Sequence, residues 1–320
     1  MVPSHRIVLI LLTLATFVEL GSLSADAEGR HGFGRLRGAT RGGATRHGIL
    51  QLRTPGPRRI LIRGGKFTMG STIPAIATAQ VMCRSEPLGK ACNATLFADE
   101  MVSHDVQLTD FWIHRTEVSV RAYRRCIEAG VCRGPTHEAG RRWTARLDHP
   151  MTLISWYEAK QYCAWVGGRL PTEAEWERAA RGWNDRIFPW GDVFNPRIAN
   201  HGRFSTQPLD DTDGHYELAP VGHYRAGRAP EGVYDLAGNV EEWVADWYAP
   251  GYPEADAVDP TGPEAGDLRV VRGGSFKDGR PWLRTTARGK ALPSARRTHR
   301  GFRCAWNVRG RGPRRKKARR

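Results

Sequence analysis

This 320-residue chain lacks the motifs that mark several large classes of enzyme. It contains no Walker loop, no HExxH pair, no GxSxG elbow and no CxxC spacing, so these signatures of nucleotide, metal and hydrolase sites are missing. No two of its eleven histidines lie within four residues of each other, so no helix can present two imidazoles on one face. Function must therefore be sought in the charge distribution, the six cysteines and longer sequence patterns.

The net charge of +16 belongs to the two ends of the chain. Residues 26–59 carry eight Arg against Asp26 and Glu28, and residues 309–320 carry eight basic residues and no acid, which leaves about +2 for residues 60–308. Both ends have few apolar residues, so we expect a disordered Gly/Arg-rich linker and a disordered basic tail around one folded domain over 60–308. Basic ends attract anionic envelope polymers or lipid head groups, or they merely keep the protein in solution.

The N-terminus predicts a signal peptide over residues 1–25. His5 and Arg6 form a short polar start, residues 7–18 are an apolar run, and small residues suited to cleavage follow at 24–25. The apolar run is shorter than the roughly 20 residues that span a bilayer. An uncleaved anchor is the alternative. We expect a protein exported to the periplasm or the medium, without a transmembrane span in the mature chain.

Short strands are predicted in the first third of the domain. Residues 60–62 and the following GGKFTMGS predict a strand, a turn and a second strand. Residues 71–103, which hold two cysteines, predict an inserted loop. Apolar alternation predicts a further strand over 106–113.

Three helices are predicted from their N-caps. Ser119, Ser155 and Thr172 each precede an amphipathic segment, and the last two are followed three residues later by Glu, which completes a capping box. Beyond Trp190, Gly, Pro, Asp and Asn dominate and the periodicity disappears. The pattern predicts an α+β domain that is rich in loops.

Six cysteines in an exported chain suggest three disulfides. Spacing does not decide among all the possible pairings, but it favours two short loops and leaves one distant pair. The resulting links are Cys83–Cys92, Cys126–Cys132 and Cys163–Cys304.

Three segments together resemble the formylglycine-generating enzyme, or sulfatase-modifying factor, family: LPTEAEWE at 170–177, GNVEEW at 238–243, and the stretch 269–304 that ends in GFRC. The resemblance covers about 250 residues in the family's order. It implies an irregular, single-domain α+β fold related to C-type lectins, with a hairpin at its start. It also supports the Cys163–Cys304 link, because related enzymes have a cysteine at both places.

The resemblance implies that the copper oxidase chemistry is absent. In the formylglycine-generating oxidase two copper-binding cysteines follow the GGS turn, and counting from Gly273 these places hold Asp278 and Leu283. Neither residue offers the thiolate that Cu(I) prefers. Glu241 also replaces an aromatic residue of the family's NxWEW motif. We therefore expect no copper.

Calcium is the cofactor that the resemblance implies, bound for structure in two loop sites through oxygen ligands. Asp235 supplies oxygen where the family has Asn, so we expect the site around it to be the stronger of the two. The alternative is that Asp235 and Glu242 cap turns or pair with arginines. The ligand positions that carry over are Asn200, Asp213 and the carbonyls of His201 and His215 for one site, and Asp235, Glu242 and the carbonyls of Gly238 and Val240 for the other.

The loop after the GGS turn is the candidate ligand-binding surface. Guanidinium groups beside an aromatic ring suit recognition of carboxylate or phosphate. Arg284 and Arg288 match the family's LRxxxR arginines, which implies structural salt bridges, whereas Lys277 and Asp278 offer an acid and a base. The candidate residues are Ser275, Lys277, Asp278, Arg280, Trp282 and Arg284.

Three hypotheses for the function follow. The first is an exported, calcium-stabilised, monomeric binding or accessory module whose protein or small-molecule ligand is unknown. The second is an enzyme of the same fold with a different chemistry, such as oxidative modification of a protein or a secondary metabolite. The third is a binder of anionic envelope polymers through the basic ends.

Overall fold

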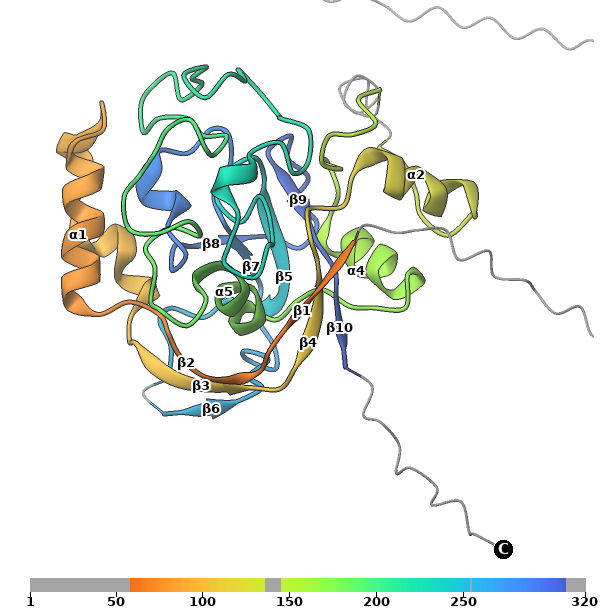
Figure 1. The fold of residues 1–320 in the computed structure, drawn as a ribbon, viewed down its shortest axis with the longest axis horizontal. Coiled ribbons are helices and arrows are strands. Elements are labelled where there is room, and N and C mark those ends of the chain that lie inside the picture. Colours follow the sequence, from red (N-terminus) through yellow and green to blue (C-terminus); the bar gives the residue numbers. More distant parts are fainter. Residues whose placement is uncertain (1–57, 136–144, 254, 309–320) are drawn as a thin grey trace, which may run out of the picture. The chain divides into compact units, whose positions relative to one another are not determined.

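The structure is a computed structural model that describes residues 58–135, 145–253 and 255–308 (Figure 1). The expected signal peptide, nearly all of the expected linker and the basic tail lie outside these residues. The described strands are β1 (Arg59–Ile62), β2 (Gly65–Met69), β3 (His104–Leu108), β4 (Phe111–His114), β5 (Glu241–Trp247), β6 (Ala257–Val258), β7 (Arg269–Arg272), β8 (Arg288–Ala291), β9 (Arg300–Phe302) and β10 (Ala305–Asn307). The described helices are α1 (Ile73–Arg84), α2 (Val120–Glu128), α4 (Trp156–Trp165), α5 (Glu173–Arg181) and the 3-10 turns η1 (Gly89–Ala91), η2 (Ala94–Glu100), η3 (Arg225–Gly227) and η4 (Arg280–Leu283).

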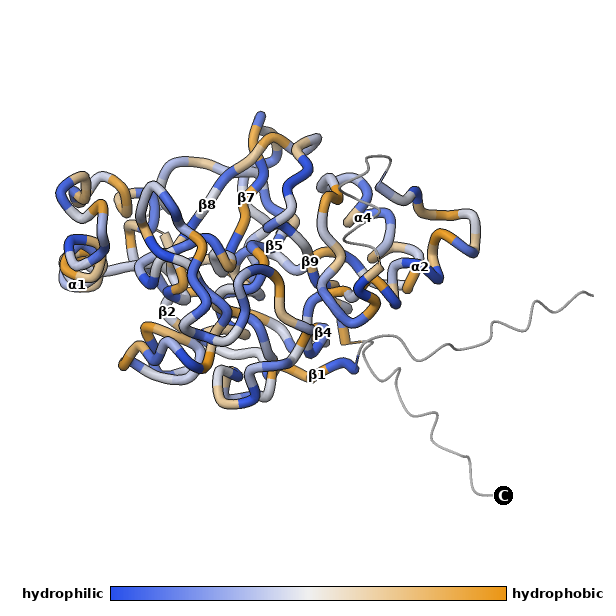
Figure 2. Tube along the Cα trace, turned by 90° about the horizontal axis from the view of Figure 1, so that it is seen from above, coloured by the Kyte–Doolittle hydropathy of each residue, from blue (hydrophilic) through white to orange (hydrophobic). Residues whose placement is uncertain are grey.

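The described strands form three small sheets. Two have three strands, in the orders β1-β4-β10 and β2-β3-β6, and the third has four, in the order β8-β7-β5-β9. In the four-stranded sheet β5 runs antiparallel to β7 and parallel to β9. Short strands and long connections confirm the predicted α+β, loop-rich fold class. Figure 2 shows the matching sequence pattern, in which hydrophobic stretches are short and alternate with hydrophilic ones.

The expected opening hairpin is wrong, although both strands exist. β1 pairs with β4, and β2 pairs with β3, so the first two strands belong to different sheets. The cause lies between them at Gly64, where an added Cβ would stand 2.3 Å from the carbonyl oxygen of Leu108. Gly64 also donates its N–H to Asp110 at 2.8 Å. The chain therefore crosses close to the β3–β4 turn and does not fold back on itself.

The inserted loop predicted over residues 71–103 is also wrong, because most of this segment is helical. Thr72 caps α1 by accepting a hydrogen bond from the backbone of Ala75, and a proline stands in the first turn. The buried face of the helix includes Ile76 and Cys83. The disulfide between Cys83 and Cys92 then ties α1 to the 3-10 turns that follow.

The three predicted helices are confirmed with their caps. Ser119 caps α2, and complete capping boxes at Ser155 and Thr172 begin α4 and α5. Each box Glu accepts a hydrogen bond from the backbone N–H of the cap residue, at 2.8 Å for Glu158 and 2.9 Å for Glu175. These two carboxylates therefore have a structural role.

Helix α5 is buried along its whole length, although its sequence EAEWERAAR is mostly charged. It packs against β2, β5 and β7 near the middle of the fold (Figure 1). Its charges are matched by ion pairs that are themselves buried. Arg272 of β7, for example, lies 2.5 Å from Glu177, and both side chains are 0% exposed. Arg288 of β8 pairs in the same way with Glu173.

All three predicted disulfides are present, and they use all six cysteines. The long-range link joins α4 to the segment between β9 and β10, across a sequence separation of 141 residues. Among the described residues no helix is long and apolar enough to cross a membrane.

Candidate functional site

The candidate loop begins at a glycine turn at the end of β7. Gly273 and Gly274 adopt φ angles of 92° and 63°, which residues other than glycine rarely adopt. An added Cβ would lie 3.0 Å from the Trp176 ring at Gly273 and 2.8 Å from the Trp282 carbonyl oxygen at Gly274. The turn therefore needs glycine at both places, and it directs Ser275 into the protein.

The positions that correspond to the copper-binding cysteines of the family hold Asp278 and Leu283. Both side chains make contacts within the fold. Asp278 accepts hydrogen bonds from the backbone N–H and the hydroxyl of Ser275, at 2.8 and 2.6 Å. Leu283 is 0% exposed and packs with Phe188 and Ala237. Because every cysteine is disulfide-bonded, no thiol is available near this loop.

The other loop residues divide into structural and exposed groups. Arg284 forms a buried bidentate pair with Glu100, at 2.5 and 2.8 Å, so its predicted structural role is confirmed. Trp282 packs against Phe97 and Phe204. The proposed acid and base are not hydrogen-bonded, because Asp278 bonds to Ser275 and Lys277 influences it only through its charge. Arg280 is a half-buried cation of this loop, with 33% of its side chain exposed.

A carboxyl pair that the sequence did not point to lies on the inner side of this loop. Glu241, at the start of β5, and Asp278 line the same cavity of about 60 Å³. Burial raises the pKa of Glu241 to about 7 in spite of Arg300, which pairs with it at 2.6 Å, and the charge of Asp278 adds to the increase. Burial also raises the pKa of Asp278. In the sequence Glu241 stands out only as a departure from a motif. Its distance from Asp278 along the chain does not indicate that the two carboxyl groups line one cavity.

The residues expected at the first calcium site lie together. Asp213 accepts hydrogen bonds from the backbone N–H groups of His201 and His215, each at 2.7 Å. Asn200 donates to the carbonyl oxygen of Glu217, while its own Oδ1 is buried without a partner in the described part of the chain. A buried oxygen without a donor and a carboxylate beside it fit a hard cation.

The acidic side chains expected at the second calcium site already accept hydrogen bonds from other residues of the protein. Glu242 accepts hydrogen bonds from Arg303 on both oxygens, at 2.5 and 2.6 Å. Asp235 accepts one from the backbone N–H of Gly222 at 2.6 Å. Burial and the charge of Asp235 raise the pKa of Glu117 well above its usual value. The alternative reading, an arginine pair and a capped turn, describes these side chains. Arg303 thus supplies a counter-charge to Glu242 in this structure, and both calcium sites stay predictions.

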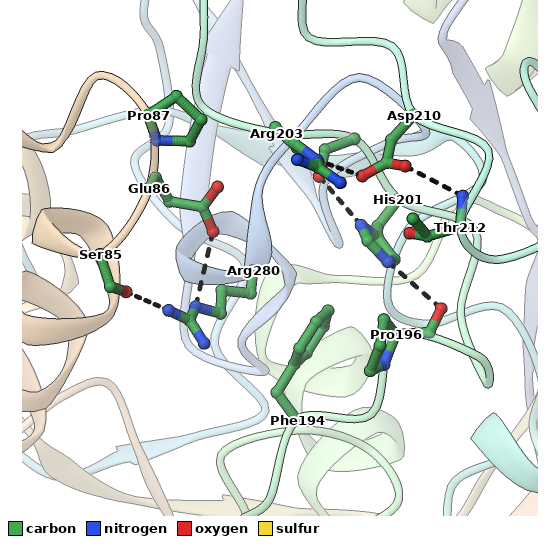
Figure 3. Close-up of a pocket in the computed structure, with 11 residues that line it drawn as sticks. Ser85, Glu86, Pro87, Phe194, Pro196, His201, Arg203, Asp210, Thr212 and Arg280 are labelled. Atoms are coloured by element: carbon green, nitrogen blue, oxygen red, sulfur yellow. Dashed lines mark hydrogen bonds and ion pairs between the residues drawn. The ribbon is translucent and has the colours of Figure 1, made fainter.

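The larger cavity of the domain lies on the outer side of the candidate loop (Figure 3). It has a volume of about 480 Å³ and is bounded by the end of α1, by the long loop after Trp190 and by Arg280. Arg203 and Asp210, from the long loop, form an ion pair at its wall. Among its lining residues only Arg280 and His201 are predicted from the sequence as site residues, because the long loop has no periodicity that would place the others.

Solved structures define the class of this fold. PvdO from Pseudomonas aeruginosa superposes with a TM-score of 0.61 at 26% identity, covering 79% of this chain and 95% of that one. Treponema denticola variable protein 1 gives a TM-score of 0.58 at 20% identity, which shows a common fold only.

The sequence then identifies the family. The model of the sulfatase-modifying factor enzyme 1-like domain matches residues 50–308, and the chain belongs to this family. It is 42% identical over 176 residues to the formylglycine-generating enzyme of Thermomonospora curvata, which is 51% of this chain and 57% of that protein. It is 38% identical over 170 residues to the bovine inactive C-alpha-formylglycine-generating enzyme 2, which is 50% of this chain and 51% of that protein. The chain thus spans about half the length of these curated relatives.

Proposed function

We propose that this protein is an exported member of the formylglycine-generating family that has lost copper-dependent oxidation and acts as a binding or accessory module. The observation that supports this most directly is the replacement of both copper ligands by Asp278 and Leu283, in a domain whose cysteines are all disulfide-bonded. Without a thiolate, Cu(I) has no ligand of the type that it prefers. The bovine relative whose name describes it as inactive is in keeping with such a role.

Export is supported by the disulfides. Three disulfides in one domain are typical of proteins that fold in oxidising compartments. The apolar run at residues 7–18, preceded by basic residues, would supply the export signal.

A structural calcium ion is part of the proposal. The chain would hold it at the first site, through the Asn200 and Asp213 side chains and the carbonyls of His201 and His215. Its role would be to fix the long loop after Trp190, which forms much of the wall of the larger cavity. We therefore expect calcium to stabilise the binding surface without taking part in chemistry.

The loss of oxidation is tested with a cysteine-containing sulfatase peptide, supplied with copper and oxygen and followed by mass spectrometry. We expect no formylglycine product from the unmodified protein. Robust conversion would overturn the proposal. The double variant Asp278→Cys and Leu283→Cys should bind Cu(I) even if the surroundings prevent turnover, whereas failure to bind copper would mean that these two places have been misassigned.

A second candidate function is an enzyme that uses acid–base chemistry, and the Glu241–Asp278 pair favours it. Two carboxyl groups with raised pKa values at one small cavity are a typical arrangement for proton transfer. Carbon-13 NMR titration should show Glu241 changing protonation near pH 7. The variant Asp278→Asn removes the neighbouring charge and should lower that pKa. Titration of Glu241 near pH 4.5 would remove the basis for this candidate.

A further inference from the structure

At the larger cavity the guanidinium groups of Arg203 and Arg280 are more exposed than the carboxylates beside them, and Figure 3 shows both pairs. Arg203 is 51% exposed, whereas Asp210 is 5% exposed. Arg280 is 33% exposed, whereas Glu86 is 10% exposed. A molecule that enters the cavity therefore meets N–H donors before it meets carboxylate oxygens.

Both guanidinium groups keep donors available. Within the described residues Arg203 donates only through Nε, to Asp210, so its two terminal nitrogens are free. Arg280 donates through one terminal nitrogen to the hydroxyl of Ser85, and its Nε lies 3.5 Å from Glu86, so its other terminal nitrogen has no partner in the described part of the chain. Free terminal nitrogens in a planar fork are well suited to a carboxylate or a phosphate.

The carboxylate behind Arg203 stays charged at neutral pH and holds the arginine in place. Burial acts to raise the pKa of Asp210, but hydrogen bonds from Arg203 and from the backbone N–H of Thr212 outweigh it and keep that pKa below its usual value. Asp210 is therefore ionised at neutral pH and supplies a counter-charge to Arg203.

Part of the remaining wall of the cavity is apolar, beside the polar residues Ser85, His201 and Thr212. Phe194, Pro196 and Pro87 line it, and Phe194 is backed by the ring of Trp190. A volume of about 480 Å³ lies within the range of small-molecule sites, roughly 300–1,000 Å³. The cavity thus combines two cationic groups with an apolar surface large enough for a ring.

The walls are joined to one another by backbone contacts. Leu88 donates its N–H to the carbonyl oxygen of Phe204 at 2.9 Å, and Gly202 donates to that of Asp278 at 3.0 Å. Gly279 allows the close approach, since an added Cβ would lie 2.8 Å from the Phe204 nitrogen. A cavity held in this way needs little ordering when a ligand binds.

We propose that this cavity binds a small molecule in which a carboxylate or phosphate group is attached to an apolar body about the size of one ring. The assignment rests on the proposed function as a binding module and names the class of ligand that the module takes. The arginine pair would hold the anionic group, and Phe194 with the two prolines would contact the apolar body.

The test uses four probes in NMR titrations of the disulfide-bonded protein at low ionic strength: benzoate, phenyl phosphate, inorganic phosphate and benzylamine. We expect benzoate or phenyl phosphate to bind, with shifts confined to residues around the cavity, and the tighter of the two identifies the preferred anionic group. Benzylamine has the same ring with the opposite charge and should not bind. Equal binding of benzylamine, or binding of neither aromatic anion, would overturn the assignment. Inorganic phosphate should bind more weakly than phenyl phosphate, and equal binding would contradict the apolar subsite.

Two matched double variants distinguish the effect of the cavity arginine on binding from the effect of removing any exposed arginine. Arg203→Met with Asp210→Asn removes the pair together, so no buried carboxylate is left unpaired. We expect at least a tenfold loss of affinity for the anionic probe. The control, Arg121→Met with Asp148→Asn, removes an ion pair on α2 whose arginine is also 51% exposed, and affinity should not change. Unchanged binding in the Arg203 variant would contradict the proposal.

A third variant covers the case in which the double substitution disturbs the loop. Arg280→Lys keeps the positive charge but loses the planar fork, so it should weaken binding while the melting temperature stays unchanged. The two proposals also fail in different ways. Formylglycine production would refute the loss of oxidation whatever the probes do, and absence of both oxidation and probe binding would refute only the class of ligand.

Discussion

The ion-paired arginines of this domain include two groups that differ in exposure. In the interior, Arg272 and Arg303 are 0% exposed and pair with carboxylates that are equally buried. At the larger cavity, the exposed Arg203 pairs with the buried Asp210, and the half-buried Arg280 lies beside Glu86, which is less exposed than the arginine. The same residue type therefore supports the fold in one place and offers donors to a ligand in the other, and the exposure of the guanidinium group distinguishes the two roles.

The largest expected effect comes from breaking an interior pair. Arg303→Met leaves Glu242 buried without its counter-charge, and we expect a loss of about 3–5 kcal/mol in the free energy of unfolding. Denaturant unfolding measures it. The exposed control Arg121→Met should cost about 0–1 kcal/mol. Similar losses in the two variants would show that burial does not separate the two groups of arginines.

Calcium removal sharpens the comparison, because Asp213 has no ion pair among the described residues whereas Glu242 has Arg303. A cation that binds only the folded protein adds roughly 2.7 kcal/mol at a hundred times its dissociation constant. We expect a chelator to lower the melting temperature of the unmodified protein and to have little further effect on Asn200→Ala with Asp213→Ala. If the chelator changes nothing, the calcium assignment is wrong. If Asp235→Ala alone abolishes the effect, calcium occupies the second site.

Asp246 is a buried carboxyl that the interior arginines do not neutralise, so it should make stability depend on pH. Burial, with the charges of Glu173 and Glu175, raises its pKa to about 8. Its unfolded value is about 3.9. A raised folded pKa means that the folded state binds the proton more tightly, so its contribution to stability is present below about pH 4 and is lost as the pH rises to about 8.

The variant Asp246→Asn mimics the protonated carboxyl and should remove this part of the pH dependence. We expect it to be more stable than the unmodified protein at pH 8, by an amount on the order of 1 kcal/mol for each pH unit over which the two states differ in protonation. Thermal unfolding at pH 5 and pH 8 gives the comparison. Identical pH dependence in the two proteins would show that Asp246 is ionised in the fold.

The smallest effect on stability is expected at the cavity. Arg203→Met with Asp210→Asn should change the free energy of unfolding by less than about 1 kcal/mol, because an ion pair with one exposed member contributes about 0–1 kcal/mol and no buried charge is left unpaired, although it should abolish most of the ligand binding. Thermal unfolding beside the NMR titration measures both. A large loss of stability would place Arg203 with the interior arginines.

Local patterns predicted those parts of the fold that depend on neighbouring residues. The capping boxes at Ser155 and Thr172 are formed by residues three positions apart, and the Cys126–Cys132 link closes a loop that spacing alone suggests. The strand partners of β1 and β2 depend on a close approach at Gly64, which has no signature within its own segment. The start of helix α1 carries ordinary helix signals, namely Thr72 as the cap and a proline in the first turn. The two cysteines of this segment instead favoured the prediction of a loop.

The candidate site was predicted less well than the fold. Arg280 and the structural role of Arg284 were found because they lie in the loop that carries the family resemblance. Arg203 and Asp210 lie in a long loop without periodicity, where only three-dimensional contacts bring them to the cavity. Glu241 and Asp278 are 37 residues apart in the sequence numbering, and only the four-stranded sheet and the glycine turn bring them to one cavity.

The larger cavity can form only late in the synthesis of the chain. Its wall joins Ser85 to Arg280 across a sequence separation of 195 residues, and Glu86 to Phe204 across 118. Contacts between such distant segments form only after the entropy of closing the loops between them has been met. A growing chain that has not yet reached residue 280 has no complete pocket. The cavity is therefore complete only after residue 280 has been made, and a fragment that ends before this residue should not bind the anionic probes.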